Sequence, residues 1–260
     1  MASRETAPSW TRAAWEWILP AAVIAGLVLG WEVLGRAFGM PDYVVPLPSV
    51  IGAELVRKGG MILDNLWITL LEALGGFLLG NAVALALAVV SIYSRSVDRV
   101  VMPFALAVRS IPVVALTPLL ILLLGVDWKP KVAVAALVVF FPTLVNMAIG
   151  LRAVDARAFE LMHVLNASRG QVLLRLRFPS SIPYFFAALK VAVPSAVLGA
   201  AVAEWINAGA GLGYLIIIAT FQFQTPLLYA TMVVACATTM LLYWSVALLE
   251  RWLVPWREER

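Results

Sequence analysis

Long runs of apolar residues, each about 20 residues long and nearly uncharged, recur along the whole of this chain. A helix rises about 1.5 Å per residue, so a helix of that length crosses the hydrocarbon layer of a bilayer. Such a helix also satisfies its own backbone hydrogen bonds in lipid. The 260 residues are 63% hydrophobic and only 13% charged, which excludes an ordinary soluble globule. We therefore predict an all-α, polytopic integral membrane protein.

The apolar runs divide best into about six spans, at residues 17–38, 65–92, 100–124, 132–150, 184–205 and 226–249. An even number of spans puts both termini on one side of the membrane. Arginine is concentrated in the stretches on that side, and the other side carries only Arg36, Arg57, Lys58, Lys129 and Lys131. By the positive-inside rule, we expect a multi-pass protein of the cell inner membrane with both termini in the cytoplasm.

This topology organises the chain into a cytoplasmic tail at 1–16, a transmembrane domain at 17–250 and a second cytoplasmic tail at 251–260. The first apolar run is too long for the core of a signal peptide and lacks an obvious cleavage site, so we expect it to be retained as an anchor. The proline-rich stretch at 40–64 is expected on the outer surface, with a short helix that Ser49 caps and that runs to Lys58.

Several classes of function are disfavoured by the composition. The net charge of +4 does not indicate a nucleic-acid partner, because the basic residues are spread over the ends of the apolar runs. No GxxxxGK[ST] phosphate loop occurs, so the chain cannot hydrolyse ATP by that route. Cys236 and His163 are the only residues of their types and lack companions for a metal site or a catalytic centre. We expect no bound metal, no bound cofactor and no enzymatic activity.

The segment from Arg152 to Pro183 is the longest inward-facing stretch and has mixed polarity. Within it, Asp155 can cap a short helix. An apolar ridge then recurs at helical spacing beside polar neighbours and is formed by Phe159, Met162 and Leu165. An exposed ridge of this kind indicates a surface that fits into a partner's groove.

A second helix is predicted in the same segment. Ser168 and Gln171 form a Ser-x-x-Gln capping box that can begin it. Phe178-Pro179 is expected to end it, because the residue before a proline is pushed out of the α region. The segment is therefore predicted to be ordered, as two short helices joined by a break at 166–168.

This segment resembles the "EAA" loop in the permease subunits of bacterial ATP-driven (ABC-type) importers. That loop has Glu-Ala-Ala, then a glycine, then a proline, and the matching positions here are Glu160-Leu161-Met162, Asn166 and Pro179. The spacing agrees, whereas the two alanines and the glycine do not. The flanking segments RSIPVVALTPLLILLLG (109–125), FFPTLVNMAIGLR (140–152) and AVAEWINAGAGLGYLI (201–216) also resemble the branch of this family that handles nitrate, sulfonates, taurine, thiamine-precursor pyrimidines and riboflavin.

The resemblance implies a type I importer permease fold and several partners. These are a second permease copy in a homodimer, a cytoplasmic ATPase dimer that binds ATP and Mg, a periplasmic or lipid-anchored solute-binding protein, and membrane lipid. It also implies that the loop docks the ATPase. The residues expected to form or shape that contact are Phe159, Glu160, Met162, Leu165, Asn166, Ser168 and Pro179.

Polar groups at membrane depth are costly and often functional. Together with an aromatic residue of the fourth span, they form our candidate substrate pathway: Arg109, Phe141, Asn146, Glu204 and Asn207. Pairing with carbonyls freed by Pro112 is an alternative role for Arg109. The glycines after Glu204 are read as a flexible outer turn between the last two spans.

The substrate is left open between two classes of small solute. The segment AEWINAGAGLGY resembles the vitamin-precursor permeases more than the sulfonate ones. We therefore favour a vitamin precursor or a riboflavin-like heterocycle, with nitrate, a sulfonate or taurine as the alternative. A stand-alone secondary transporter coupled through Glu72 and Glu204 is a further alternative, but it leaves the ordered inward loop unexplained.

Overall fold

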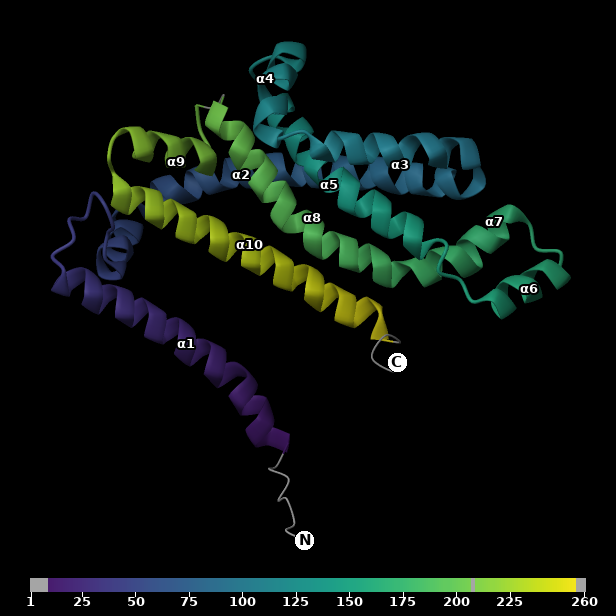
Figure 1. Cartoon of the computed structure of the whole chain (residues 1–260), viewed down its shortest axis with the longest axis horizontal. Helices are drawn as coiled ribbons and strands as arrows, with labels where there is room; N and C mark the ends of the chain where they lie inside the picture. The colour runs from purple at the N-terminus through teal and green to yellow at the C-terminus, as the bar shows by residue number, and fades with distance from the viewer. Residues whose placement is uncertain (1–8, 207–208, 256–260) are drawn as a thin grey trace, which may run out of the picture. The chain divides into compact units, whose positions relative to one another are not determined.

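The computed structural model describes residues 9–206 and 209–255, with side chains from residue 18 onward, and this part of the chain is helical between short turns (Figure 1). The helices are α1 (Ser9–Ala37), α2 (Pro48–Tyr93), α3 (Arg95–Ser110), α4 (Val113–Leu124), α5 (Lys129–Gly150), α6 (Ala156–Val164), α7 (Arg169–Val172), α8 (Phe178–Ile206), α9 (Leu212–Phe221) and α10 (Thr225–Leu253), with a π-helical turn at Leu173–Arg177.

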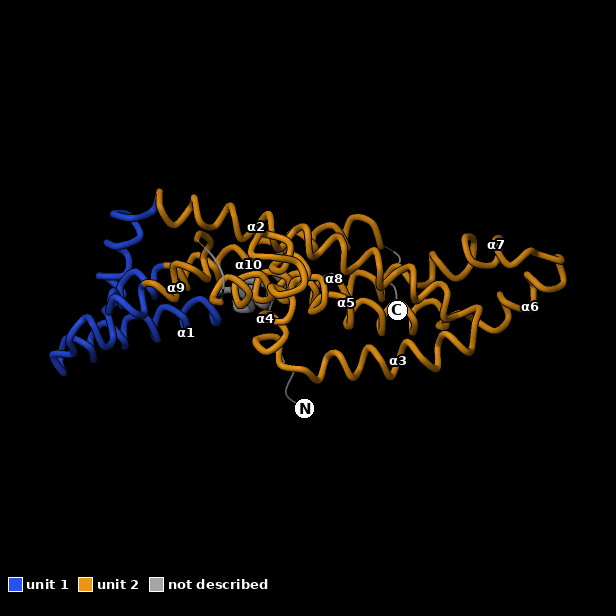
Figure 2. Tube along the Cα trace, turned by 90° about the horizontal axis from the view of Figure 1, so that it is seen from above, with its two compact units in different colours: residues 1–59, 219–230 blue, residues 60–218, 231–260 orange. Residues whose placement is uncertain are grey.

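The chain divides into two compact units, drawn in different colours in Figure 2. Unit 1 contains Met1–Gly59 and Ala219–Ala230, and unit 2 contains Gly60–Ile218 and Thr231–Arg260. The first boundary falls directly after a kink in α2, where Lys58 has non-helical dihedral angles (φ −114°, ψ 15°). The fold class predicted from the apolar runs is confirmed.

The helices that are long and apolar enough to cross a membrane agree with the predicted spans. Among the described residues there are 5 such helices, or up to 6 if a bent pair is one span. That bent pair is α3 and α4, which meet at 103° around Ile111-Pro112. The span predicted at 100–124 is therefore bent sharply at its proline. Pro112 cannot donate a backbone hydrogen bond, and Ile111 before it is extended (φ −79°, ψ 127°), so the helix stops and restarts.

Unit 1 is organised around the carboxylate of Glu32 on α1. It accepts hydrogen bonds from the backbone N–H of Ser49 at 3.0 Å, from its hydroxyl at 2.8 Å, and from Arg36 Nε at 2.8 Å. Ser49 is therefore not the N-cap that the sequence suggested. Pro48 is the first residue of α2, and Ser49 lies inside the helix, where its exposed N–H is satisfied by a side chain from α1. The helix also does not end at Lys58, because α2 continues to Tyr93.

Small residues set the distance between the central helices of unit 2, in which α5 runs beside α8 (Figure 1). The buried core there contains alanine and valine from α2, α5 and α8: Ala73, Ala135, Val139, Ala192, Ala196, Val197 and Ala200. A Cβ atom at Gly76 or Gly80 of α2 would meet the backbone of α5, and one at Gly199 of α8 would meet Ala135 of α5. Backbones at this separation have no room for larger side chains.

Two glycines on α2 test this packing with the same substitution. We expect Gly80→Ala to lower the free energy of unfolding by about 1–3 kcal/mol, because its Cβ would overlap the backbone of Ala136. At Gly60 a Cβ would meet nothing within 4 Å, so Gly60→Ala should be neutral or stabilising by up to about 1 kcal/mol through helix propensity. Thermal unfolding of the purified protein in detergent measures both, and equal effects would contradict the close approach of α2 and α5.

Candidate substrate cavity and coupling loop

A cavity of about 390 Å³ lies between α3, α4, α5 and α8 of unit 2. Three predicted pathway residues, Arg109, Phe141 and Asn146, line it together. Most of the remaining wall is aliphatic, and Ser195 of α8 adds a hydroxyl group. The break between α3 and α4 makes this arrangement possible, because it turns the chain directly after Arg109 and brings residues of both helices to the same cavity.

The polar groups of the cavity have specific partners. The guanidinium carbon of Arg109 lies 4.6 Å from the centre of the Phe141 ring, within the range of a cation–π interaction. The Asn146 amide donates to the carbonyl of Pro142 at 2.8 Å, and the Ser195 hydroxyl donates to that of Val191 at 2.8 Å. A cation stacked on an aromatic ring, in an otherwise apolar cavity, suits a planar solute that carries carbonyl or anionic oxygens.

Glu204, the fourth predicted pathway residue, is buried elsewhere and does not line the cavity. It is 1% exposed. One carboxylate oxygen accepts from the Thr69 hydroxyl at 2.7 Å, and the other accepts from the N–H of Gly213 at 2.6 Å. The Thr69 hydroxyl in turn accepts from the N–H of Leu212 at 2.8 Å. These bonds tie the start of α9 to α2 and α8. The fifth pathway residue, Asn207, lies outside the described residues.

The segment after Glu204, predicted as a flexible turn, contains the helix α9. Its start is fixed by Gly211, which has a left-handed φ of +115° and donates its N–H to Asn65 Oδ1 at 2.7 Å. A Cβ at Gly213 would overlap the carbonyl of Ala201 on α8. The glycines therefore allow a tight turn and close packing, and the segment predicted as an outer turn also contains a helix.

Glu72, a second buried carboxylate, is paired. Its Oε1 lies 2.9 Å from Lys131 Nζ on α5, and the side chains are 6% and 11% exposed. Lys131 was interpreted from sequence only as one of the outer basic residues. A buried ion pair costs much of its Coulombic energy in desolvation, so it fixes the register of α2 on α5 more than it adds stability.

The first half of the segment 152–183, called the loop below, agrees with its predicted capping pattern. Asp155 accepts from the N–H groups of Arg157 at 2.8 Å and Ala158 at 3.2 Å, and so caps α6. The Ser168 hydroxyl accepts from the N–H of Gln171, and the Gln171 amide oxygen accepts from that of Ser168, which completes the capping box of α7. Both short helices begin at their predicted caps.

Asn166, at the position of the family glycine, has a left-handed φ of +50°. Its N–H donates to the carbonyl of His163, and the N–H of Ala167 donates to that of Met162. This pair of bonds is a Schellman motif, whose left-handed residue is usually glycine and sometimes asparagine. Asn166 therefore occupies a backbone position that a glycine would also satisfy.

The second half of the loop differs from the prediction that Phe178-Pro179 ends a helix. The chain instead passes from α7 through the π-helical turn Leu173–Arg177 into α8 without a break. The N–H of Phe178 donates to the carbonyl of Leu173, five residues earlier. A π turn is wider than an α turn, so it relieves the clash between the Pro179 ring and the carbonyls of the preceding turn.

The predicted apolar ridge is divided between two faces of α6. Phe159 and Met162 line a cavity of about 260 Å³ between α6, α7 and the end of α2. Leu165 lies instead with Leu161 and Val164, which are 66%, 58% and 77% exposed respectively. Leu161, Val164 and Leu165 have i, i+3, i+4 spacing, which also indicates an apolar face. We predicted the ridge from the pattern that begins at Phe159 instead. The residues missed at this surface are thus Leu161 and Val164.

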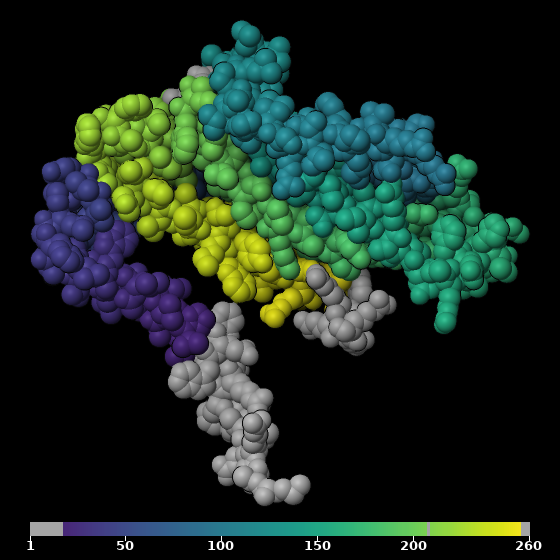
Figure 3. Space-filling view, in the orientation of Figure 1, coloured from purple at the N-terminus to yellow at the C-terminus, as the bar shows by residue number. Residues whose placement is uncertain are grey.

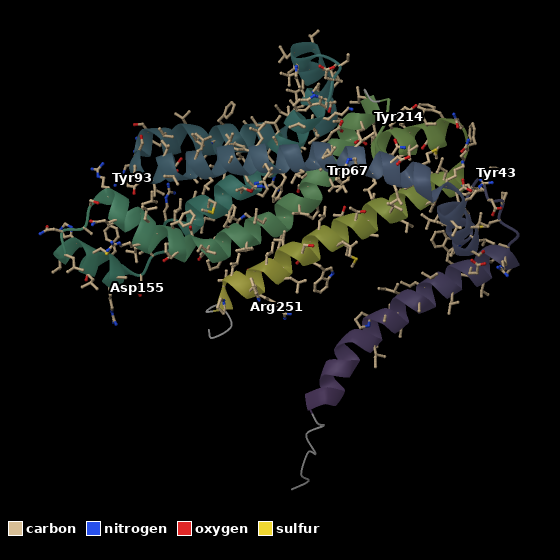
Figure 4. The ribbon with its side chains drawn as sticks, turned by 180° about the vertical axis from the view of Figure 1, so that it is seen from behind. Tyr43, Trp67, Tyr93, Asp155, Tyr214 and Arg251 are labelled. Carbon is tan, nitrogen blue, oxygen red and sulfur yellow. The ribbon has the colours of Figure 1, made fainter. Side chains whose placement is uncertain are left out.

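The loop is fastened to the ends of the long helices of unit 2. The Tyr93 hydroxyl, at the end of α2, donates to the carbonyl of Arg169 at 2.9 Å. Arg152 forms an ion pair with Asp98 of α3 at 2.7 Å. Tyr93 and Asp155 lie at the same end of this unit (Figure 4), and the surface of α6 and α7 is uncovered on the face shown in Figure 3. The loop is an ordered, exposed projection attached to α2, α3 and α5.

The set of hydrogen bonds around Glu204, which we call the clamp, can be tested at Thr69. This side chain is 0% exposed. We expect Thr69→Val to lower the free energy of unfolding by about 1–3 kcal/mol, because it leaves buried groups on α8 and α9 without a partner. Thr117→Val is the matched control, since Thr117 is also 0% exposed but donates only within α4, to the carbonyl of Val113. Thermal unfolding in detergent should show the larger loss for Thr69→Val, and the reverse order would contradict the clamp.

Comparisons with known proteins agree with this architecture. Residues 76–259 match the family model described as "Binding-protein-dependent transport system inner membrane component". A solved structure described as an amino acid ABC transporter with histidines has a similar fold, with a TM-score of 0.64 at 16% identity over 76% of this chain and 97% of that chain.

Relatives named for particular solutes match over most of their length. The chain is 33% identical to the formylaminopyrimidine transport permease protein ThiX of Halalkalibacterium halodurans, over 93% of this chain and 96% of the relative. It is 33% identical to the riboflavin transport system permease protein RibX of Chloroflexus aurantiacus, over 92% and 89%. It is 32% identical to the putative aliphatic sulfonates transport permease protein SsuC of Bacillus subtilis, over 92% and 86%. The chain therefore belongs to the family of binding-protein-dependent transport system inner membrane components, multi-pass transport subunits that work with a separate ATPase and a solute-binding protein and are not themselves enzymes.

Proposed function

We propose that this chain forms the path by which a vitamin precursor or a riboflavin-like heterocycle crosses the inner membrane. The observation that carries this proposal is the cavity in which the Arg109 guanidinium stacks on Phe141 beside Asn146. An aromatic face, a cation and an amide suit a flat ring that carries carbonyl groups. The relatives named for formylaminopyrimidine and riboflavin support this class.

A sulfonate or another small oxyanion is the second candidate. The relative named for aliphatic sulfonates supports it, and the guanidinium of Arg109 would bind a tetrahedral oxyanion as well as a carbonyl. The aromatic ring separates the two classes, because stacking on Phe141 favours a planar heterocycle and contributes little to a small alkyl sulfonate. The stand-alone secondary transporter is disfavoured, since Glu204 is held in a structural clamp and Glu72 is paired with Lys131.

In the transport cycle we propose, two copies of this permease enclose the path. A loaded solute-binding protein docks on the outer side, and a cytoplasmic ATPase dimer with ATP and Mg docks on the inward loops. Both termini lie in the cytoplasm. ATP binding closes the ATPases, moves the loops and exposes the cavity to alternate sides of the membrane.

The ATPase contact in this proposal is the exposed face of α6 formed by Leu161, Val164 and Leu165. Phe159 and Met162 act behind it, since they line the cavity between α6 and α7. Asp155 and Asn166 fix the two ends of α6, so the face is presented on a helix with defined limits. Glu160 and Ser168, both exposed, shape the same surface.

A charge on this face should disrupt docking. We expect Leu165→Glu to reduce co-purification of the ATPase by about tenfold or more, because a carboxylate would be buried in the apolar contact without a partner. The matched control is Leu174→Glu on the π-helical turn after α7, where the leucine is 69% exposed against 66% for Leu165. Loss of the ATPase with Leu174→Glu alone would place the contact on that turn and contradict this proposal.

The substrate class is tested with the complete transporter. The solute-binding protein encoded beside the permease is first screened by calorimetry against riboflavin, hydroxymethylpyrimidine, taurine and nitrate, and ATP-driven uptake of the bound solute is then measured in proteoliposomes. We expect a heterocycle to bind, and Phe141→Ala to lower its uptake about 2- to 10-fold through lost stacking.

Phe140→Ala is the control for that measurement, because Phe140 packs against the core of Ala84, Ala105 and Leu144 and does not line the cavity. Tight binding of taurine or nitrate, with no heterocycle bound, would overturn the assignment to vitamin precursors.

A further inference from the structure

Arg177 is the last residue of the π-helical turn and lies where three helical segments meet. Its Nη1 donates to the carbonyl of Leu151 at 2.9 Å, directly after the end of α5. Its guanidinium carbon also lies 5.5 Å from the ring centre of Phe159 on α6. One side chain, directly before the start of α8, therefore contacts both α6 and the end of α5.

The two contacts of Arg177 need a planar, delocalised cation. A guanidinium can stack on an aromatic ring while an N–H at its edge donates in the plane, whereas a lysine ammonium cannot do both in one orientation. Its Nε is buried and has no hydrogen-bond partner among the described residues. Leaving a buried donor unpaired costs free energy, so this side chain is placed for its contacts with α5 and α6 rather than for its own solvation.

The other fastenings of the loop lie nearer to the surface. The side chains of Arg152 and Asp98 are 46% and 29% exposed, and such an ion pair is screened and weak. Tyr93 is also exposed. Leu151, in contrast, is 0% exposed and belongs to the core cluster with Leu144 and Met147 of α5. A displacement of the Leu151 carbonyl is thus passed to the packed body of α5.

Both helices that Arg177 connects to α6 form walls of the substrate cavity. Phe141 and Asn146 belong to α5, and Val191 and Ser195 belong to α8. The cavity of about 260 Å³ beside Phe159 gives α6 room to shift against α7. A change between π and α winding of the turn Leu173–Arg177 would rotate Arg177 relative to the helix that follows.

We propose that Arg177 is the positioning residue that transmits movement of α6 to α5 and α8, and so couples ATPase closure to the substrate cavity. The inference rests on the proposed function, since it requires an ATPase docked on α6. When α6 moves, Phe159 moves with it, the stacked guanidinium follows, and the hydrogen bond to Leu151 carries the displacement to α5. The exposed docking face of α6 is separate from this link, so docking and transmission are separable.

The experiment measures movement at the cavity without needing the substrate. A Cys236→Ser, Ser195→Cys background carries one thiol in the cavity wall, and its labelling rate with N-ethylmaleimide is compared with and without ATP, Mg and vanadate in the complex with the ATPase. We expect trapped nucleotide to change the rate about fivefold or more in this background. Arg177→Gln should abolish most of that change while the ATPase still co-purifies, and Arg177→Lys should restore part of it.

Arg175→Gln is the matched control, because Arg175 is an exposed arginine on the same turn that makes neither contact of Arg177. Its response should equal that of the background. A full response in Arg177→Gln, an equal loss in Arg175→Gln, or loss of the ATPase from the Arg177→Gln complex would each overturn the inference. Absence of any response in the background itself would instead contradict the proposed function.

Discussion

The close packing of α5 against α2 and α8 is the constraint on which the rest of unit 2 depends. Lipid gives these helices no hydrophobic reason to associate, so their attraction comes from dispersion contacts between closely approaching backbones. Gly76, Gly80 and Gly199 permit that approach. The same packing makes α5 a rigid element, and both the cavity wall and the carbonyl of Leu151 move with it. In the function that we propose, small residues therefore serve the transport path indirectly, by packing the helices that form its wall.

Polar residues at membrane depth divide into two kinds once their partners are known. Glu204 and Thr69 satisfy backbone N–H groups at the start of α9, which would otherwise be unpaired in a buried turn. Arg109, by contrast, is an exposed residue that lines the cavity and stacks on Phe141. Glu204 and Arg109 were placed in one group from the sequence, because a charged side chain of either kind costs free energy when it lies in lipid. What separates them is burial: the Glu204 carboxylate is 1% exposed and its oxygens accept hydrogen bonds from this chain, whereas Arg109 is exposed at the cavity.

The spans and the caps could be predicted because their signals are local. Apolar length locates the helices, and Asp155, Ser168 and Gln171 act within three residues of the groups they satisfy. Pro112 itself marks the position of the bend between α3 and α4, but the angle of 103° also depends on how both helices pack onto α5 and could not be predicted. At Ser49 a local signal gave a wrong prediction. Its side chain is typical of a helix cap, but Glu32 from another helix satisfies the backbone there.

The continuous passage from α7 to α8 could not be derived from Phe178-Pro179, because the proline rule describes an α-helix and this chain widens one turn instead. That widening has a mechanical consequence. A break at Pro179 would leave a hinge between the loop and the transmembrane helix, and movement of α6 would be lost in it. A helical turn with Arg177 at its end keeps the connection stiff while leaving one defined place where the winding can change. In the coupling that we propose, the π turn before the proline and the contacts of Arg177 meet one requirement, which is that the loop moves the helix rather than bends away from it.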